Sequence, residues 1–143
     1  MELIAQLNWR YAAKRMTGEK VPAEKLNKVL DAIQLAPSSM GLQPYTVLVI
    51  ENEALQKKIQ PAAYNQPQIV EASTLLVFAV WETYPDEAIE AYINNMASTR
   101  GVEVTTLTGL KTGIENKVRS TAAEALFNWN ARQAYIALGF GIA

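Results

Sequence analysis

The stretch "LAPSSMGLQPYTVLVI" (residues 35–50) joins a segment of helical periodicity to a strongly apolar run, and it decides how the chain is interpreted. Pro37 removes a backbone donor and restricts the residue before it, so a helix must end here. Gly41 allows a tight backbone path, and Pro44 sets the beginning of the following strand. Taken alone, the loop is either a connection between two elements or a ligand-holding segment.

The two apolar runs "YTVLVI" (45–50) and "TLLVFAV" (74–80) predict strands that are buried on both faces. The residues between them predict a helix, a loop and a further helical turn. Together with helical segments before and after, these runs predict an α+β domain whose helices pack on a small sheet.

Four further segments carry apolar side chains at helical spacing and predict helices. They are residues 1–15, 22–36, 84–99 and 125–143. A capping-box pattern, Thr121 with Glu124, precedes the last of them. Residues 99–120 mix glycine, threonine and charged side chains, and we expect an irregular or mobile region there.

Composition narrows the possible chemistry. The 143 residues suit one domain, and a net charge of −1 gives no reason to expect a nucleic-acid partner. The chain has no cysteine and no histidine, so thiolate chemistry, disulfides and a histidine base are excluded, and no metal site is expected. No apolar run is long enough to span a bilayer and the first residues lack a signal-peptide layout, so we expect a cytoplasmic protein.

The last residues, "IALGFGIA" (136–143), are apolar, and two strands make only a marginal sheet. We therefore expect further chain to complete the core, with docking of this segment against a partner subunit as the alternative. Apolar helix surface in 1–14 and 121–143 also predicts a homodimer with a large interface.

Three motifs, in order along the chain, carry a resemblance to a known family. "WRYAAKR" (9–15) is similar to an Arg-x-Ser-x-Lys pattern, and "APSSMGLQPY" (36–45) to a Pro-Ser-Ser-x-x-x-Gln-Pro-aromatic loop. "YNQPQIVEAS" (64–73) resembles a segment whose asparagine faces a flavin. With these motifs the chain resembles the flavin-dependent nitroreductases.

The resemblance implies a dimeric α+β fold with helices around a small, mainly antiparallel sheet, and FMN bound at the subunit interface. It also implies a ping-pong reaction, in which NADH or NADPH is the electron donor and a nitroaromatic, a quinone or a similar small molecule is the acceptor. The flavin carries this chemistry, so no residue is assigned a catalytic role.

By the same resemblance, Arg10 reaches the FMN phosphate, and Lys14, one turn further on the same helix face, approaches the pyrimidine edge of the ring. Pro37, Ser38 and Ser39 come from the other subunit, and Asn65 hydrogen-bonds the ring. The complete set of expected cofactor-binding residues is Arg10, Tyr11, Ala12, Lys14, Pro37, Ser38, Ser39, Gly41, Gln43, Asn65 and Gln68.

The chain also departs from the family pattern. Ala12 stands where a serine often holds the phosphate, and Gln68 where some members have lysine near the ring. Family members continue past the last helix with further strands and phosphate ligands. The alternative is therefore a non-catalytic flavin- or ligand-binding α+β protein of the same fold, or an incomplete fragment without activity.

Overall fold

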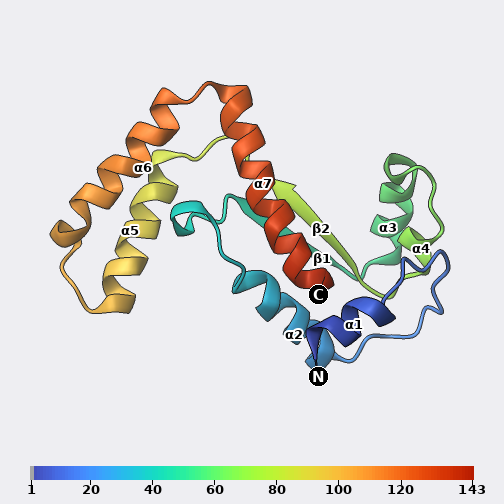
Figure 1. Ribbon diagram of the computed structural model, residues 1–143. Helices are drawn as coiled ribbons and strands as arrows, with labels where there is room; N and C mark the ends of the chain where they lie inside the picture. Colours follow the sequence, from blue (N-terminus) through green and yellow to red (C-terminus); the bar gives the residue numbers. More distant parts are fainter. Residues whose placement is uncertain (1) are drawn as a thin grey trace. The chain divides into compact units, whose positions relative to one another are not determined.

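A computed structural model describes residues 2–143, and Figure 1 traces its helices and strands along the chain. The elements are α1 (Leu3–Trp9), α2 (Ala23–Gln34), β1 (Tyr45–Ile50), α3 (Glu53–Ile59), α4 (Gln68–Glu71), β2 (Leu75–Val80), α5 (Asp86–Arg100), α6 (Thr108–Ser120) and α7 (Ala123–Ile142), with single 3₁₀ turns at Ser39–Gly41, Gln60–Ala63 and Val104–Leu107.

Both predicted strands are confirmed, and they pair with each other as an antiparallel sheet. The Trp81 N–H donates to the Pro44 carbonyl at one end (3.1 Å), and the Thr74 hydroxyl donates to Glu51 at the other (3.4 Å). The expected burial on both faces is wrong, because Leu48 and Val49 of β1 are 46% and 42% exposed. With only two strands in the described part of the chain, each strand is an edge strand.

The chain divides into two compact units. The first unit comprises residues 2–36, 47–79 and 137–143, and the second comprises 37–46 and 80–136. The prediction of a single domain stays a prediction.

The second unit has the clearer hydrophobic core, which lies between the loop before β1 and the helices α5 and α6. Its buried side chains are Leu42, Tyr84, Ile89, Ile93 and Ile114. The apolar spacing predicted for residues 84–99 is confirmed, since α5 buries two isoleucines one turn apart. Figure 1 shows α5 and α6 side by side, joined by the 3₁₀ turn.

The prediction that residues 99–120 are irregular is wrong, because residues 108–120 form helix α6. Gly109 and Gly113 disfavour a helix by about 1 kcal/mol each. Burial outweighs this: Ile114 is fully buried in the core. Ion pairs from Lys111 to Glu90 and from Arg119 to Asp86 also join α6 to α5. Tertiary packing therefore decides the conformation of this segment.

The predicted capping box at Thr121 is also wrong. The Thr121 hydroxyl donates to the Lys117 carbonyl (2.6 Å), so this residue caps the end of α6. Helix α7 begins at Ala123, one residue too late for Thr121 to be its N-cap.

In the first unit, the last turn of α7 packs closely against α2. A Cβ atom at Gly141 would lie 2.8 Å from Cγ1 of the buried Ile33, so the two helices approach closely there. Helix α2 follows Pro22 and ends before Pro37, as the sequence predicts. The helix, loop and helical turn predicted between the strands are confirmed as α3, the 3₁₀ turn and α4.

Candidate functional site

The residues predicted to bind a cofactor fall into two groups, one in each compact unit. The first unit holds Arg10, Tyr11, Ala12, Lys14, Asn65 and Gln68. The second unit holds Pro37, Ser38, Ser39, Gly41 and Gln43.

The predicted helix through residues 1–15 is shorter than expected, because α1 ends at Trp9. Arg10 is extended (φ −65°, ψ 145°), so Lys14 does not lie one helical turn further on a shared face, and that prediction is wrong. The physical reason is that α1 has seven residues, no side-chain cap and no buried residue. Isolated helices of this length are marginal in water.

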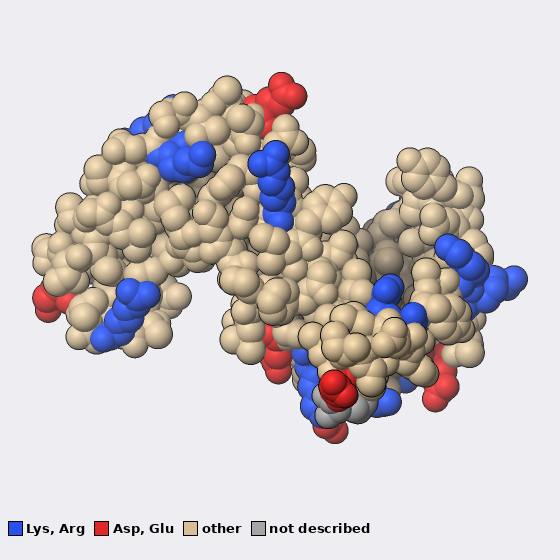
Figure 2. All heavy atoms as spheres, viewed as in Figure 1, with Lys and Arg blue, Asp and Glu red and all other residues tan. Residues whose placement is uncertain are grey.

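Arg10 and Lys14 are exposed, and no carboxylate among residues 2–143 forms an ion pair with either of them. Figure 2 shows Lys and Arg scattered over the face drawn, rather than gathered into one basic stripe. These two cations are therefore locally available to an anionic ligand.

Helix α4 fixes the extended segment that follows Arg10. The Gln68 amide donates to the Ala13 carbonyl (3.4 Å), and the Met16 N–H donates to Glu71 (3.0 Å). The Arg15 guanidinium binds the same Glu71 carboxylate through Nε (2.7 and 3.0 Å) and Nη2 (2.6 Å). The structure thus brings the predicted Arg-x-x-x-Lys segment and the predicted Gln68 together.

The anchor on Glu71 should weaken in acid. The hydrogen bond from Arg15 holds the pKa of Glu71 below its ordinary value of 4.5, with a further contribution from the Met16 N–H. A lowered pKa means that the contact stabilises the fold above that value and is lost as the pH falls through the pKa of the folded state. We expect the protection factor of the Met16 amide, which is its intrinsic exchange rate divided by its observed rate, to fall as the pH is lowered through the pKa of Glu71 in the folded state. Glu71→Gln should remove this pH dependence, and an unchanged profile in that variant would contradict the assignment.

Gln68 and Asn65 present polar groups beside this segment. The Gln68 Oε1 atom is buried and accepts no hydrogen bond from residues 2–143. Such an acceptor is unfavourable unless a ligand or water supplies a donor. Asn65 is exposed and left-handed (φ 54°), directly after the left-handed Tyr64 (φ 55°). The Gln60 side chain holds this turn by donating to the Gln66 carbonyl (3.3 Å).

The loop 37–43 in the second unit has its own hydrogen bonds. Ser38 Oγ accepts from the Gln43 N–H (3.0 Å), and the Ser38 carbonyl accepts from the Gly41 N–H (3.0 Å). Ser38 therefore closes the loop as an acceptor on both its hydroxyl and its carbonyl oxygen. The predicted role of Pro44 is confirmed, since it is buried and β1 begins at the next residue.

Backbone strain concentrates in the predicted cofactor segments. Among residues 2–143, the non-glycine residues with positive φ are Met40, Gln43, Tyr64 and Asn65. Gly41 is also left-handed (φ 73°), and a Cβ atom there would lie 2.5 Å from the Tyr92 hydroxyl oxygen, so the predicted tight path is confirmed. Strain of this kind persists where the surroundings fix it, and it is common at ligand sites.

Three side chains that the motifs did not reveal hold the loop in place. The Tyr92 hydroxyl donates to the Met40 carbonyl (2.7 Å), and the Tyr84 hydroxyl donates to the Leu42 carbonyl (3.2 Å). Gln133 Oε1 accepts from the Ser39 N–H (2.8 Å). Burial raises the pKa of Tyr84 to about 12 and also raises the pKa of Tyr92, so both keep the proton that they donate. For Gln133, the sequence signal that could have indicated this role was a polar glutamine within the apolar segment that forms α7.

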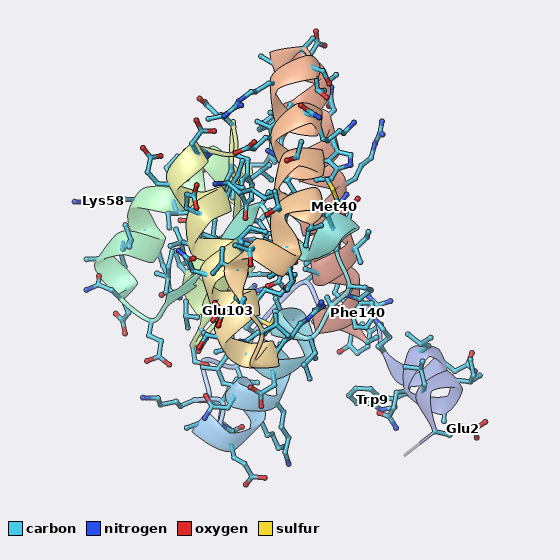
Figure 3. All side chains as sticks on the ribbon, turned by 90° about the vertical axis from the view of Figure 1, so that its left-hand side faces the viewer. Glu2, Trp9, Met40, Lys58, Glu103 and Phe140 are labelled. Carbon is cyan, nitrogen blue, oxygen red and sulfur yellow. The ribbon has the colours of Figure 1, made fainter. Side chains whose placement is uncertain are left out.

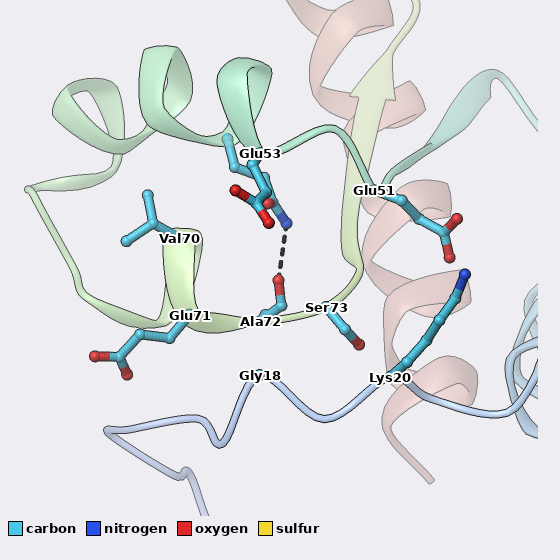
Figure 4. A pocket seen from close by; sticks show the side chains of 9 residues that line it. Gly18, Lys20, Glu51, Glu53, Val70, Glu71, Ala72 and Ser73 are labelled. Atoms are coloured by element: carbon cyan, nitrogen blue, oxygen red, sulfur yellow. Dashed lines mark hydrogen bonds between the residues drawn. The ribbon is translucent and has the colours of Figure 1, made fainter.

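A pocket of about 340 Å³ lies in the first unit, but it contains none of the predicted residues. It is lined by Gly18, Lys20, Glu51, Glu53, Gln56, Val70, Glu71, Ala72 and Ser73. Figure 4 shows Lys20 and Glu51 pointing towards one another, and the buried Gln56 donating to the Ala72 carbonyl (2.9 Å). With three carboxylates in its lining, this pocket is a poor site for a phosphate.

Among residues 2–143, no group of three or more acidic side chains could hold a metal ion. None of the helices in that range combines the length and apolarity needed to cross a membrane.

Comparison with known proteins identifies relatives by sequence. The chain is 31% identical to an FMN reductase [NAD(P)H] of Bacillus subtilis over 126 residues, which is 87% of this chain and 51% of that protein. It is 28% identical over 144 residues to a Staphylococcus haemolyticus protein described as an NAD(P)H nitroreductase, covering 95% of this chain and 65% of that protein. The chain thus spans about half to two thirds of the length of these curated relatives.

Solved structures agree in fold. A nitroreductase family protein of Streptococcus pneumoniae superposes with a TM-score of 0.79 at 13% identity, covering 98% of this chain and 69% of that one. An Exiguobacterium sibiricum protein, described as a nitroreductase and crystallised in complex with FMN, gives a TM-score of 0.78 at 21% identity, over 99% and 68% of the two chains.

The family model "Nitroreductase family" matches residues 7–140, a range that contains every predicted site residue. The two-stranded antiparallel sheet with its surrounding helices, the motif loop before β1 and this match agree with one another. The chain therefore belongs to the nitroreductase family.

Proposed function

We propose that this chain is the FMN-binding part of an oxidoreductase that transfers electrons from NADH or NADPH to a small acceptor, such as a nitroaromatic or a quinone, in ping-pong order. One observation carries the proposal. Within residues 2–143, every non-glycine residue with positive φ lies in two of the three motifs that the family resemblance assigns to the flavin site, residues 36–45 and 64–73. The names of the relatives, an FMN reductase and an NAD(P)H nitroreductase, support the same chemistry.

The residues present fit FMN. Arg10 is an exposed guanidinium without an ion pair within the described residues, and this group matches the geometry of a phosphate. The buried Gln68 Oε1 lacks a donor, which an N–H group of the flavin ring would supply. When bound, FMN supplies the electron-transfer chemistry, and the protein binds and orients it. Lys14 and Asn65 are further proposed contacts, with Tyr11 and Ala12 lining the segment. The loop with Pro37, Ser38, Ser39, Gly41 and Gln43 would contribute from the other subunit of the proposed homodimer.

A homodimer is part of this proposal, because apolar side chains on two helices are accessible. On α1, Leu3 and Ile4 are 54% and 60% exposed, and Trp9, 78% exposed, points away from the helix (Figure 3). On α7, Tyr135 is 74% exposed. Obligate interfaces commonly bury more than about 2,000 Å², and these surfaces would contribute to one. Sedimentation at micromolar concentration tests this, and a stable monomer would contradict it.

The proposed location is the cytoplasm.

The experiment that tests the function is the colour and FMN titration of the purified chain. A yellow protein that releases flavin on denaturation supports the proposal. A colourless protein that cannot be reconstituted with FMN favours the alternative, a non-catalytic protein of the same fold or a fragment without activity.

Arg10→Ala should weaken FMN binding by about 1.5–3 kcal/mol, because it removes one charge-assisted hydrogen bond to the phosphate. This corresponds to a dissociation constant about 10- to 150-fold higher in a fluorescence titration. Arg100→Ala is the matched control, since it removes one exposed arginine outside the predicted set. Equal affinities in the two variants would show that Arg10 does not bind the phosphate.

A further inference from the structure

We propose that Gln133 is a positioning residue, which fixes the backbone of the loop 38–43 in its ligand-ready shape before any ligand binds. Tyr92 acts as a second anchor of the same loop. The inference rests on the proposed function, because it assigns these side chains to the preparation of the flavin-contacting loop.

The Gln133 side chain is oriented from both ends. It is 6% exposed, and its Nε2 donates to the Trp129 carbonyl one turn earlier on α7 (3.2 Å). A carbonyl oxygen can accept a hydrogen bond from the side-chain nitrogen of Gln133 but not from its oxygen. Nε2 therefore faces the Trp129 carbonyl, and Oε1 points away from it. There it accepts the Ser39 N–H at 2.8 Å, from a residue 94 positions earlier. The acceptor is thus held in one place by a helix rather than by the loop.

The loop needs such anchors because its backbone is unfavourable. Directly after Ser39, Met40 and Gly41 have φ values of 54° and 73°, and Gln43 has 43°. Non-glycine residues in this region persist only when their neighbours fix them. The bond from Tyr92 to the Met40 carbonyl holds the middle of the loop, and the bond from Gln133 holds its beginning.

Fixing the Ser39 backbone also fixes the direction of its exposed side chain, which belongs to the predicted flavin contacts. A loop that is already ordered loses less conformational entropy when a ligand binds. Gln133 would therefore increase FMN affinity without touching FMN itself.

The first measurement is hydrogen exchange of the full chain without flavin, at the amides of Ser39, Gly41 and Gln43. Gln133→Met keeps an unbranched side chain of similar length but removes the strong acceptor. Asn130→Leu is the matched control. Asn130 is on the same helix, is fully buried and donates to the Trp81 carbonyl (2.8 Å), so its loss removes one buried hydrogen bond outside the loop.

We expect Gln133→Met to accelerate exchange of the three loop amides by about 5- to 150-fold relative to Asn130→Leu, as the loss of one hydrogen bond to a buried group predicts. Tyr92→Phe keeps the ring but removes the hydroxyl that binds the Met40 carbonyl, so it should accelerate exchange at Gly41 and Gln43. If Gln133→Met does not fold, Tyr92→Phe is compared with Asn130→Leu in its place. Equal loop exchange in the anchor variants and in Asn130→Leu would overturn the proposal.

The second measurement is an FMN titration of the same variants. Weaker binding in Gln133→Met and Tyr92→Phe than in Asn130→Leu supports the link from loop order to affinity, and equal binding overturns that link. If the wild-type chain binds no FMN, the proposed function and the flavin part of this inference both fail. The exchange comparison would still decide separately whether Gln133 and Tyr92 set the shape of the loop.

Discussion

Gly41→Ala should lower the free energy of unfolding by about 2–4 kcal/mol, because two unfavourable effects coincide. The residue has a φ of 73°, a left-handed conformation that disfavours a side chain by about 1–2 kcal/mol. The new Cβ would also lie 2.5 Å from the Tyr92 hydroxyl oxygen, so this tyrosine must move and lose its bond to the Met40 carbonyl. Urea unfolding monitored by circular dichroism measures the change.

Two comparisons separate the conformational effect from the clash. Gly101 has a similar φ of 64°, but a Cβ there meets nothing within 4 Å, so Gly101→Ala should show the conformational effect alone. In a Tyr92→Phe background the clashing oxygen is absent, and Gly41→Ala should then be less destabilising than in the wild type. If Gly41→Ala and Gly101→Ala lower stability equally, the close contact in the loop is not important.

Ile114→Ala should destabilise the protein by about 2–5 kcal/mol, because truncating a buried isoleucine leaves a cavity. Ile114 is fully buried beside Ile89 and Ile93, and it is the buried residue of α6. Since this side chain is what outweighs the glycines of α6, the variant should also lose helical signal. Chemical denaturation and far-UV circular dichroism measure the two effects.

Gly113→Ala, on the same helix, is a control that should change the stability in the opposite direction. A Cβ atom at Gly113 meets nothing within 4 Å, so alanine fits there. It should stabilise the protein by up to about 1 kcal/mol through helix propensity. Destabilisation by Gly113→Ala would mean that residues 108–120 are not helical in solution.

The strands and most helices could be predicted from the sequence because their signals are local. β-branched runs define β1 and β2, and apolar spacing defines α2 and α5. Helix α6 could not be predicted, since its glycines and threonines argue against a helix and only contact with α5 supplies the compensating burial of Ile114. The accessible side chains of β1 were missed because a run of apolar letters does not show how many strands pair beside it.

The residues of the candidate site also divide into those that a local pattern predicts and those that depend on long-range contacts. The Pro-Ser-Ser motif and Gly41 could be predicted from residue type, because proline and glycine act on their own backbone. The shared helix face of Arg10 and Lys14 was wrong, because a seven-residue helix with no buried side chain has no packing that would extend it past Trp9. Tyr92 and Gln133 were missed because their role depends on long-range contacts that no local pattern encodes.

The bond between Ser39 and Gln133 also sets an order of events during protein synthesis. Its two partners are separated by 94 residues, which a ribosome adds in roughly 5–20 s at 5–20 residues per second. Through that interval Ser39 lacks its acceptor, although Tyr92, the second anchor of the loop, is synthesised earlier. The loop therefore gains its full set of anchors late in translation, and a rare codon or a pause between the two positions would lengthen the time that it spends without the Gln133 contact.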